Sequence, residues 1–326
     1  MEGNSTTTLN TTRTEKAPTA ITTIPLSELI AWCTAFALVA VAIIIGNALT
    51  IAVFTRKRII RMRANYFLTT LAVADLLVGA FAVPLYIHQL VWYWKTNSNE
   101  KDIFVAFMAI DIFTGFASIF TLTTIALERL YAVMWPLKNM VTSKRVYYFV
   151  ISVVWFLSAL VALLYFRNDG LKVFKLRVFF YFVIFFISSS LLIICVAYVL
   201  IWKKVTLLKD DSPRQGSKYQ EEMEQRKRRT QEKSLVTTLL ILSLVFVLTW
   251  VPFYVLNIVV FFYAKREPMD IPFEAFCFTK LLHYSNSLAN PIVYSIRIPR
   301  FARSLLGFFR KRKSALMVSL RLSIKR

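Results

Sequence analysis

The stretch IFVAFMAIDIFTGFASIFTLTTIALERLYAVM, Ile103–Met134, decides the fold of this chain. It is longer than the roughly 20 apolar residues that a helix needs to cross a hydrocarbon core of about 30 Å. A charged pair, Glu128 and Arg129, stands close to its end. Ionised side chains inside a membrane segment are costly and therefore tend to serve a function. The stretch predicts a membrane helix that carries a functional charge near one membrane surface.

Six further apolar blocks of similar length flank this one. The chain is 57% hydrophobic and 18% charged, against roughly 25% charged in soluble proteins. Lipid offers the backbone no hydrogen-bond partners, so these blocks must be helices, whereas the strands of a membrane barrel would be shorter and would alternate. We therefore predict an all-α membrane protein, a seven-transmembrane-helix bundle. Its helices are expected at Leu29–Phe54, Tyr66–Trp92, Ile103–Met134, Val146–Phe166, Val178–Trp202, Leu235–Tyr263 and Phe273–Ile296.

The net charge of +22 could suggest a nucleic-acid partner, but the placement of the charge argues against one. The first, third and fifth connections between the blocks and the tail together carry 28 of the 40 Lys and Arg residues. The N-terminus and the other connections carry 10. The positive-inside rule places the basic side in the cytoplasm. We expect an extracellular N-terminus, a cytoplasmic C-terminus, no nucleic-acid partner, and attraction to anionic membrane lipid.

The polar regions complete the expected organisation. No cleavable signal pattern precedes the first helix, so we expect that helix to act as the insertion signal, and the three cysteines show no disulfide framework. Asn4 and Asn10 begin glycosylation sequons. The expected parts are an extracellular disordered N-terminus (residues 1–28), a seven-helix transmembrane domain (29–298) with its third cytoplasmic loop at about 203–233, and an amphipathic helix with a short basic tail on the membrane (299–326).

Polar markers stand in these apolar blocks in a fixed order. They are Asn47, Asp75, Glu128-Arg129, Trp155, Trp250-x-Pro252 and Asn290-Pro291-x-x-Tyr294. This arrangement resembles the rhodopsin-like (class A) G-protein-coupled receptors over about residues 30–312, with the subfamily unclear. The resemblance implies a plasma-membrane receptor without enzymatic activity. Such a receptor would bind an extracellular small-molecule or peptide ligand and activate a heterotrimeric G protein.

Asp75 is the only acid of the second block and would be costly if it faced lipid, so it must face the bundle. In the resembling family this position lines a hydrated sodium pocket together with the positions of Ser118, Asn286, Ser287 and Asn290. Oxygen ligands around one carboxylate suit a small hard cation. The alternative is a hydrogen-bonded polar core that holds only water. No other metal or cofactor is indicated.

The guanidinium of Arg129 needs an ion-pair partner in the inactive receptor. Glu128 is adjacent to it, and Glu232 lies twenty residues before Pro252, which is about 30 Å along a helix. In the family an ionic lock joins the third and sixth helices at this depth. The resemblance therefore implies that Arg129 pairs with Glu232 at rest and is released on activation. A solvated glutamate in a charged loop is the alternative.

Prolines and aromatic residues complete the implied switch. Pro252 removes a backbone hydrogen bond and is expected to kink the sixth helix, and Pro291 should loosen the seventh helix in the same way. The family repacks aromatic side chains near these positions on activation, although plain packing would also account for them. The aromatic residues concerned are Tyr198, Phe246, Trp250 and Tyr294.

A candidate ligand pocket lies around Asp111. This residue stands eighteen positions, or five helical turns, before Arg129, and so in the outer third of the bundle. It resembles the position at which amine receptors bind a ligand ammonium, and Tyr284 stands where those receptors place a tyrosine on that aspartate. A cationic amine is expected, with a peptide, a lipid or a zwitterion as open alternatives. The pocket would also use Trp250, Phe253, Tyr254 and Asn257, which offer ring faces and an amide.

Lys280 lies one turn above Tyr284 and complicates this interpretation. It could pair with Asp111 and compete with an amine, snorkel outward, or join Asp111 in binding a zwitterion. Opsins attach retinal to a lysine of the seventh helix, but at the position that Tyr284 occupies here. An opsin-like photoreceptor is therefore the alternative that a visible absorbance band would support.

The sequence departs from the family in several places. Phe104 replaces a family cysteine, so the usual outer disulfide cannot form. The fifth helix has no proline, and Phe182 and Phe186 stand where monoamine receptors carry hydroxyls, so a catechol ligand is not expected. The rival from another class is a membrane channel or transporter. Such proteins often show repeated halves or broken helices near the midplane, and this sequence shows no such repetition.

Overall fold

All regular structure in the described part of the chain is helical. The computed structural model describes residues 24–55, 64–96, 98–167, 173–207, 237, 240–241, 243–260, 262, 272–297 and 301–307. Within these ranges there is no strand, and six helices are long and apolar enough to cross a membrane. This agrees with the prediction of an all-α membrane bundle.

The helices follow the predicted blocks closely. The first begins at Leu26, three residues earlier than expected. The longest continuous described part of the sixth is Ser243–Val260. The other elements are α1 (Leu26–Phe54), α2 (Ala64–Leu77), η1 (Val78–Ala82), α3 (Val83–Thr96), α4 (Lys101–Met134), α5 (Pro136–Val141), α6 (Lys144–Arg167), α7 (Val173–Leu207) and α9 (Phe273–Arg297). A short helical segment follows at residues 301–307.

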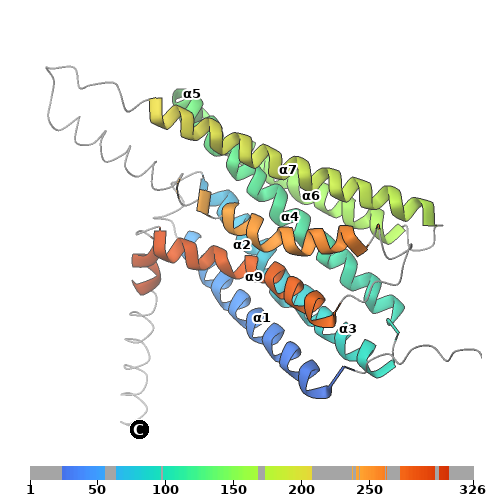
Figure 1. Ribbon diagram of the computed structural model, residues 1–326. Coiled ribbons are helices and arrows are strands. Elements are labelled where there is room, and N and C mark those ends of the chain that lie inside the picture. Colours follow the sequence, from blue (N-terminus) through green and yellow to red (C-terminus); the bar gives the residue numbers. More distant parts are fainter. Residues whose placement is uncertain are drawn as a thin grey trace, which may run out of the picture.

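Helix α4 forms the centre of the bundle. It packs against α2, α6 and α7, while α1 packs against α2 and α9 (Figure 1). Buried apolar side chains such as Ile119 and Leu122 fill the space around α4. The outer face of α6 instead exposes large apolar side chains, as a surface in contact with lipid chains should. They include Phe149, Phe156, Leu160 and Leu163.

The second predicted block is a single span that contains a wide turn. The helix passes from α2 through the π-helical segment η1 into α3. Pro84 has no N–H to donate to the carbonyl of Ala80, and the wide turn lies at this interruption of the hydrogen-bond pattern. The turn therefore has a local cause in the sequence, although hydropathy alone gives no sign of it.

Two glycines allow close helix contacts. A Cβ on Gly79 would lie 2.9 Å from the Cγ2 of Ile43 and 3.1 Å from the carbonyl oxygen of Ala40. A Cβ on Gly46 would lie 3.1 Å from Pro291. Both positions bring α1 against its neighbours, and a larger side chain at either would push the helices apart.

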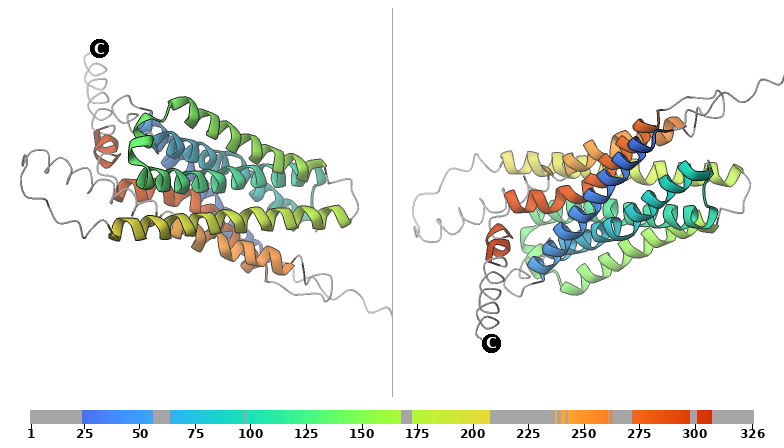
Figure 2. Two further views of the ribbon diagram at one scale, coloured as in Figure 1. Left: turned by 90° about the horizontal axis from the view of Figure 1, so that it is seen from above. Right: turned by 90° about the horizontal axis from the view of Figure 1, so that it is seen from below.

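The chain turns away from the axis of α9 after the seventh helix. The segment 301–307, dark red in Figure 2, lies across the end of the bundle in both views. Phe301 anchors it, with ring centroids 5.3 Å from Phe54 and 6.0 Å from Tyr294. This segment falls within the predicted amphipathic region at 299–326, whose other residues, 299–300 and 308–326, lie outside the described residues.

Candidate ligand-binding site and switch

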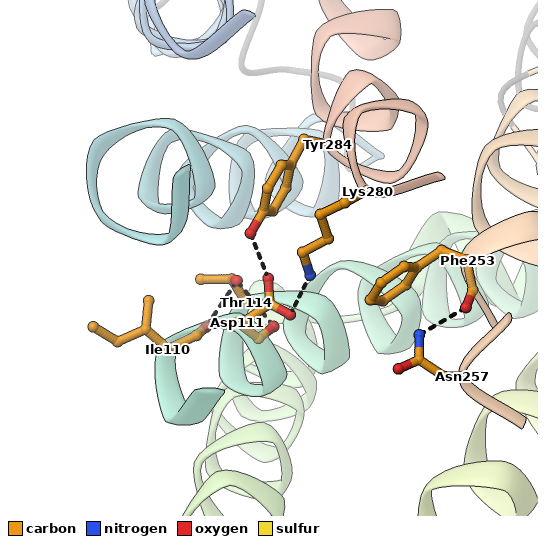
Figure 3. Close-up of polar contacts among 7 residues, drawn as sticks. All are labelled: Ile110, Asp111, Thr114, Phe253, Asn257, Lys280 and Tyr284. Atoms are coloured by element: carbon orange, nitrogen blue, oxygen red, sulfur yellow. Dashed lines mark hydrogen bonds and ion pairs between the residues drawn. The ribbon is translucent and has the colours of Figure 1, made fainter. Parts of the chain in front are cut away.

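An ion pair joins α4 to α9 near the beginning of α4. The Nζ of Lys280 lies 2.7 Å from Oδ2 of Asp111, and the hydroxyl of Tyr284 donates a hydrogen bond of 3.0 Å to Oδ1 (Figure 3). Lys280 and Tyr284 stand one helical turn apart and so face α4 together. The side chain of Lys280 is only 4% exposed and that of Asp111 12%. Lys280 therefore pairs with Asp111 and does not snorkel outward.

Four aromatic rings surround the ammonium group of Lys280. Its Nζ lies 4.2 Å from the ring centroid of Phe253 and 4.8 Å from that of Tyr284. Phe107 and Tyr86 follow at 5.6 Å and 5.9 Å. At such distances a ring face attracts a cation, most strongly where water is excluded. The ammonium is held by one carboxylate and by a cage of rings.

Tyr86 and Phe107 were not among the residues selected from the sequence. Phe107 stands one turn before Asp111 and therefore shares a helix face with it, which is a signal that could have found it. Tyr86 follows the wide turn η1, which changes the helical register after Asp75, so regular spacing from Asp75 gives no such signal.

A cavity of about 220 Å³ opens beside the ion pair. Its lining contains six of the seven predicted ligand residues, namely Asp111, Lys280, Trp250, Phe253, Tyr254 and Asn257. The seventh, Tyr284, donates a hydrogen bond to Asp111. Opposite the pair, α7 contributes an apolar wall with Phe179, Val183 and Ile187. The cavity thus combines one charged end with a largely apolar body, as small-molecule sites commonly do.

Hydrogen bonds hold the sixth helix beside this cavity. The hydroxyl of Tyr254 donates to the carbonyl of Ile184 at 3.2 Å and lies 3.3 Å from the hydroxyl of Ser188. Asn257 donates to the carbonyl of Phe253 in its own helix at 2.7 Å (Figure 3). These two hydrogen bonds of Tyr254 join the sixth helix to α7.

His283 is a site residue that the sequence analysis did not select. It is 8% exposed and lines the cavity beneath Lys280. Its ring centroid lies 4.5 Å from that of Trp250 and 4.9 Å from that of Phe253. Its Nδ1 is buried without a hydrogen-bond partner among the described residues. A polar atom of this kind at a cavity is a candidate contact for a ligand.

Trp250 lies between the cavity and the core beneath it. Its ring stacks on Phe246 with centroids 5.1 Å apart, and Phe246 is fully buried. On the other side, a Cβ on Gly115 would lie 3.2 Å from the Trp250 ring. The ring is therefore confined, and anything that displaces it must also displace Phe246 or α4.

A second polar cluster surrounds Asp75. The amide of Asn290 donates to Oδ2 of Asp75 at 2.6 Å, and the hydroxyl of Ser118 donates to Oδ1 at 3.4 Å. Ser287 is a further hydrogen-bonding neighbour of this carboxylate. Asn286 lines a small cavity of about 10 Å³ together with Ser118 and Ser287. The structure thus gathers the five residues selected for the sodium site.

The residues present fit a monovalent cation. Asp75 is completely buried, and its partners are neutral amide and hydroxyl groups. The Oδ1 of Asn47 is buried without a partner among the described residues, and its Nδ2 donates to the carbonyl of Ser287 at 3.0 Å. Within the described residues no group of three His, Cys, Asp or Glu could hold a metal. One carboxylate with neutral oxygens suits Na⁺ better than a transition metal.

Of the expected switch residues, Glu128 and Arg129 lie near the opposite end of α4. Arg129 pairs with its neighbour Glu128. Tyr198 is buried beside Ser243 of the sixth helix. Tyr294 is also buried, and its hydroxyl has no partner among the described residues. Pro252 lies within the sixth helix and Pro291 within α9.

Some selected residues lie outside the described ranges. Glu232, the proposed partner of Arg129, is one of them. Asn4 and Asn10, the candidate glycosylation sites, are the others.

These features define a class of protein. The family model described as 7 transmembrane receptor (rhodopsin family) matches residues 46–294, which is most of the chain. The chain therefore belongs to the rhodopsin family of seven-transmembrane receptors. It is a multi-pass membrane receptor and not an enzyme, as the sequence predicted.

Several receptors are similar to it over part of their length. The D(2) dopamine receptor A of Xenopus laevis is 34% identical over 137 residues, which is 40% of this chain and 30% of the relative. The D(2)-like dopamine receptor of Takifugu rubripes is 34% identical over 119 residues, 36% of this chain and 25% of the relative. The human histamine H4 receptor is 36% identical over 92 residues, 28% and 23% respectively. The matched stretches cover less than a third of each of these relatives.

Proposed function

We propose that this chain is a receptor for a small molecule with an ammonium group, and that it activates a heterotrimeric G protein. The observation that carries the proposal is the position of Asp111, a carboxylate at the charged end of an otherwise apolar cavity. The similar proteins named above are receptors for dopamine and histamine, both of them amines. A peptide or lipid ligand is the alternative within the same family.

The route of the signal would lead from the cavity to the Arg129 end of the bundle. Trp250 lines the cavity and stacks on Phe246. Below, Asp75 joins α2, α4 and α9 through Ser118 and Asn290. A ligand that contacts Trp250 differently in two bundle arrangements would shift their populations by that difference in affinity. The G protein would bind near Arg129 in the favoured arrangement.

The charge distribution supports the orientation that this function needs. The Arg129 end carries most of the Lys and Arg residues, so it would face the cytoplasm of a plasma-membrane receptor. The cavity would then open to the extracellular side. Basic residues of the tail would favour anionic lipid and help to dock the G protein.

The test is ligand-dependent nucleotide exchange. The chain is expressed in membranes with added G proteins, and biogenic amines, amino acids, peptides and lipids are screened. We expect a subset of ammonium-bearing compounds to accelerate exchange, and Asp111→Ala to abolish the response. Asp102→Ala, an exposed acid in the first turn of α4, is the control and should respond like the unmodified receptor.

Other outcomes would point to the other classes. A response only to peptides or lipids that survives Asp111→Ala would overturn the ammonium proposal. Ion flux through liposomes without any exchange on G proteins would support a channel or transporter. A visible absorbance band on the purified protein, lost in Lys280→Met, would support a photoreceptor.

A further inference from the structure

The charges of the candidate ligand site are balanced before a ligand arrives. Both oxygens of Asp111 are engaged, one by Lys280 at 2.7 Å and one by Tyr284 at 3.0 Å. The ammonium of Lys280 also occupies the ring faces of Phe253 and Tyr284. Lys280 thus provides, from within the chain, the cation that an amine ligand would bring.

A simple amine would have to break this pair. Its ammonium could reach Asp111 only by displacing Lys280, whose own charge would then remain in an apolar cavity without a counter-ion. Removing one partner from a buried ion pair is strongly unfavourable, and we take the cost as a factor of about 100 in affinity or more. The pocket therefore disfavours a ligand with a single positive charge.

A ligand with charges of both signs avoids this cost. Its ammonium would take the place of Lys280 on Asp111, and its acidic group would take the place of Asp111 on Lys280. Each buried charge would exchange one partner for another, so no charge would be left alone. His283 adds a further position, because its unpartnered Nδ1 lines the same cavity and can donate or accept according to its tautomer.

We propose that the ligand of this receptor is a zwitterion, with an ammonium group for Asp111, an acidic group for Lys280, and an apolar body. This proposal rests on the proposed function, in which Asp111 binds an ammonium group. The apolar body follows from the rest of the cavity, about 220 Å³ with an apolar wall on α7. Amino acids with aromatic or branched aliphatic side chains have this chemistry.

Matched sets of probes measure how much the acidic group of a ligand contributes to its affinity. Each set contains an amino acid, its methyl ester and its decarboxylated amine, so the ammonium and the side chain stay the same. Suitable sets begin with phenylalanine, tyrosine, tryptophan, histidine and leucine, and a second series places the carboxylate further from the ammonium. Binding is measured as a dissociation constant on the purified full-length receptor and as the rise in its melting temperature.

The variant Lys280→Met removes the positive charge and keeps an apolar side chain of similar length. On the unmodified receptor we expect at least one amino acid to bind about 100-fold more tightly than its ester and its amine. On Lys280→Met the order should reverse, because Asp111 is free for an amine and now repels a carboxylate. Lys101→Met, at the exposed start of α4, should preserve the order of affinities of the unmodified receptor. Lys280→Arg keeps the positive charge and should still bind the amino acid more tightly than its ester and its amine.

The outcomes separate this proposal from the proposed function. If amines bind Lys280→Met tightly and no amino acid binds the unmodified receptor better than its amine, the zwitterion is excluded while ammonium binding at Asp111 stands. Equal affinities for all three probes, or an order that Lys280→Met leaves unchanged, would also overturn the proposal. If no ammonium compound binds any variant, the proposed function fails and the zwitterion with it.

Discussion

Asp111 and Asp75 lie inside the bundle with different partners, and this difference sets their chemistry. Asp111 faces the cation of Lys280. Asp75 has only the neutral donors of Asn290 and Ser118 among its hydrogen-bond partners. A buried carboxylate without a counter-charge is costly. We therefore propose that Asp75, and not Asp111, is the acid that binds a sodium ion.

Sodium should consequently stabilise the folded receptor through Asp75. An ion that binds only the native state at ten times its dissociation constant contributes about 1.4 kcal/mol. We expect the melting temperature to rise when NaCl replaces KCl at equal ionic strength, and this rise to disappear in Asp75→Asn. The Asp102→Ala variant should keep the effect. A sodium-specific rise that survives Asp75→Asn would place the ion elsewhere.

Part of the candidate site could be predicted from individual residues. Helical spacing puts Asp111, Tyr284 and Lys280 near one depth, and the structure brings the three together. Spacing did not decide among the directions that the Lys280 side chain could take, because its course depends on how α4 and α9 pack. His283 was missed for a related reason, since a histidine beside a tyrosine carries no marker of its own.

At the scale of the elements, the packing of α1 against η1 depends on a missing side chain. A Cβ added at Gly79 would lie 2.9 Å from the Cγ2 of Ile43 and 3.1 Å from the carbonyl oxygen of Ala40. Ile43 is β-branched and fully buried, so it has little freedom to move. A methyl group at Gly79 must separate the helices.

We predict that Gly79→Ala lowers the free energy of unfolding by about 1–3 kcal/mol, as overpacking usually does. The measurement is the melting temperature of the detergent-solubilised receptor. Gly307→Ala is the matched control, because a Cβ at Gly307 would meet nothing within 4 Å. Equal melting temperatures for the two variants would show that α1 and η1 separate freely.

Within the described residues, the helical type of the long elements and their places in the sequence could be predicted almost completely. The apolar blocks gave the helices because backbone polar groups in lipid must bond within their own segment. Hydropathy did not reveal η1, because the wide turn at Pro84 changes the hydrogen-bond pattern and leaves the apolar composition intact. It also could not settle the exact helix ends, as the start of α1 at Leu26 shows.

At the scale of the whole molecule, the proposed lock between Arg129 and Glu232 would restrain the sixth helix. We predict that Glu232→Ala raises nucleotide exchange without ligand by about 1.5- to 5-fold, which corresponds to the loss of an ion pair worth about 0.2–1 kcal/mol. Glu224→Ala, in the same connection, is the control. Unchanged basal exchange in Glu232→Ala would remove the lock from the mechanism.

The orientation of the whole chain gives a further prediction. On sealed cells, trypsin should spare the basic run Arg226–Arg229, while an epitope added before Asn4 should bind antibody without permeabilisation. Glycosidase treatment should raise electrophoretic mobility if Asn4 or Asn10 carries a glycan. Cleavage within 226–229 from outside would invert the topology and place Asp111 on the cytoplasmic side.

The pairing of Lys280 with Asp111 also bears on how the receptor responds to voltage. A lone cation that enters a site within the bilayer crosses part of the transmembrane field, and a full crossing is worth about 2.3 kcal/mol per elementary charge at 100 mV. A ligand that arrives with no net charge and meets a neutral pair moves almost no charge through that field. Such a receptor would report the same concentration in a resting and in a depolarised cell.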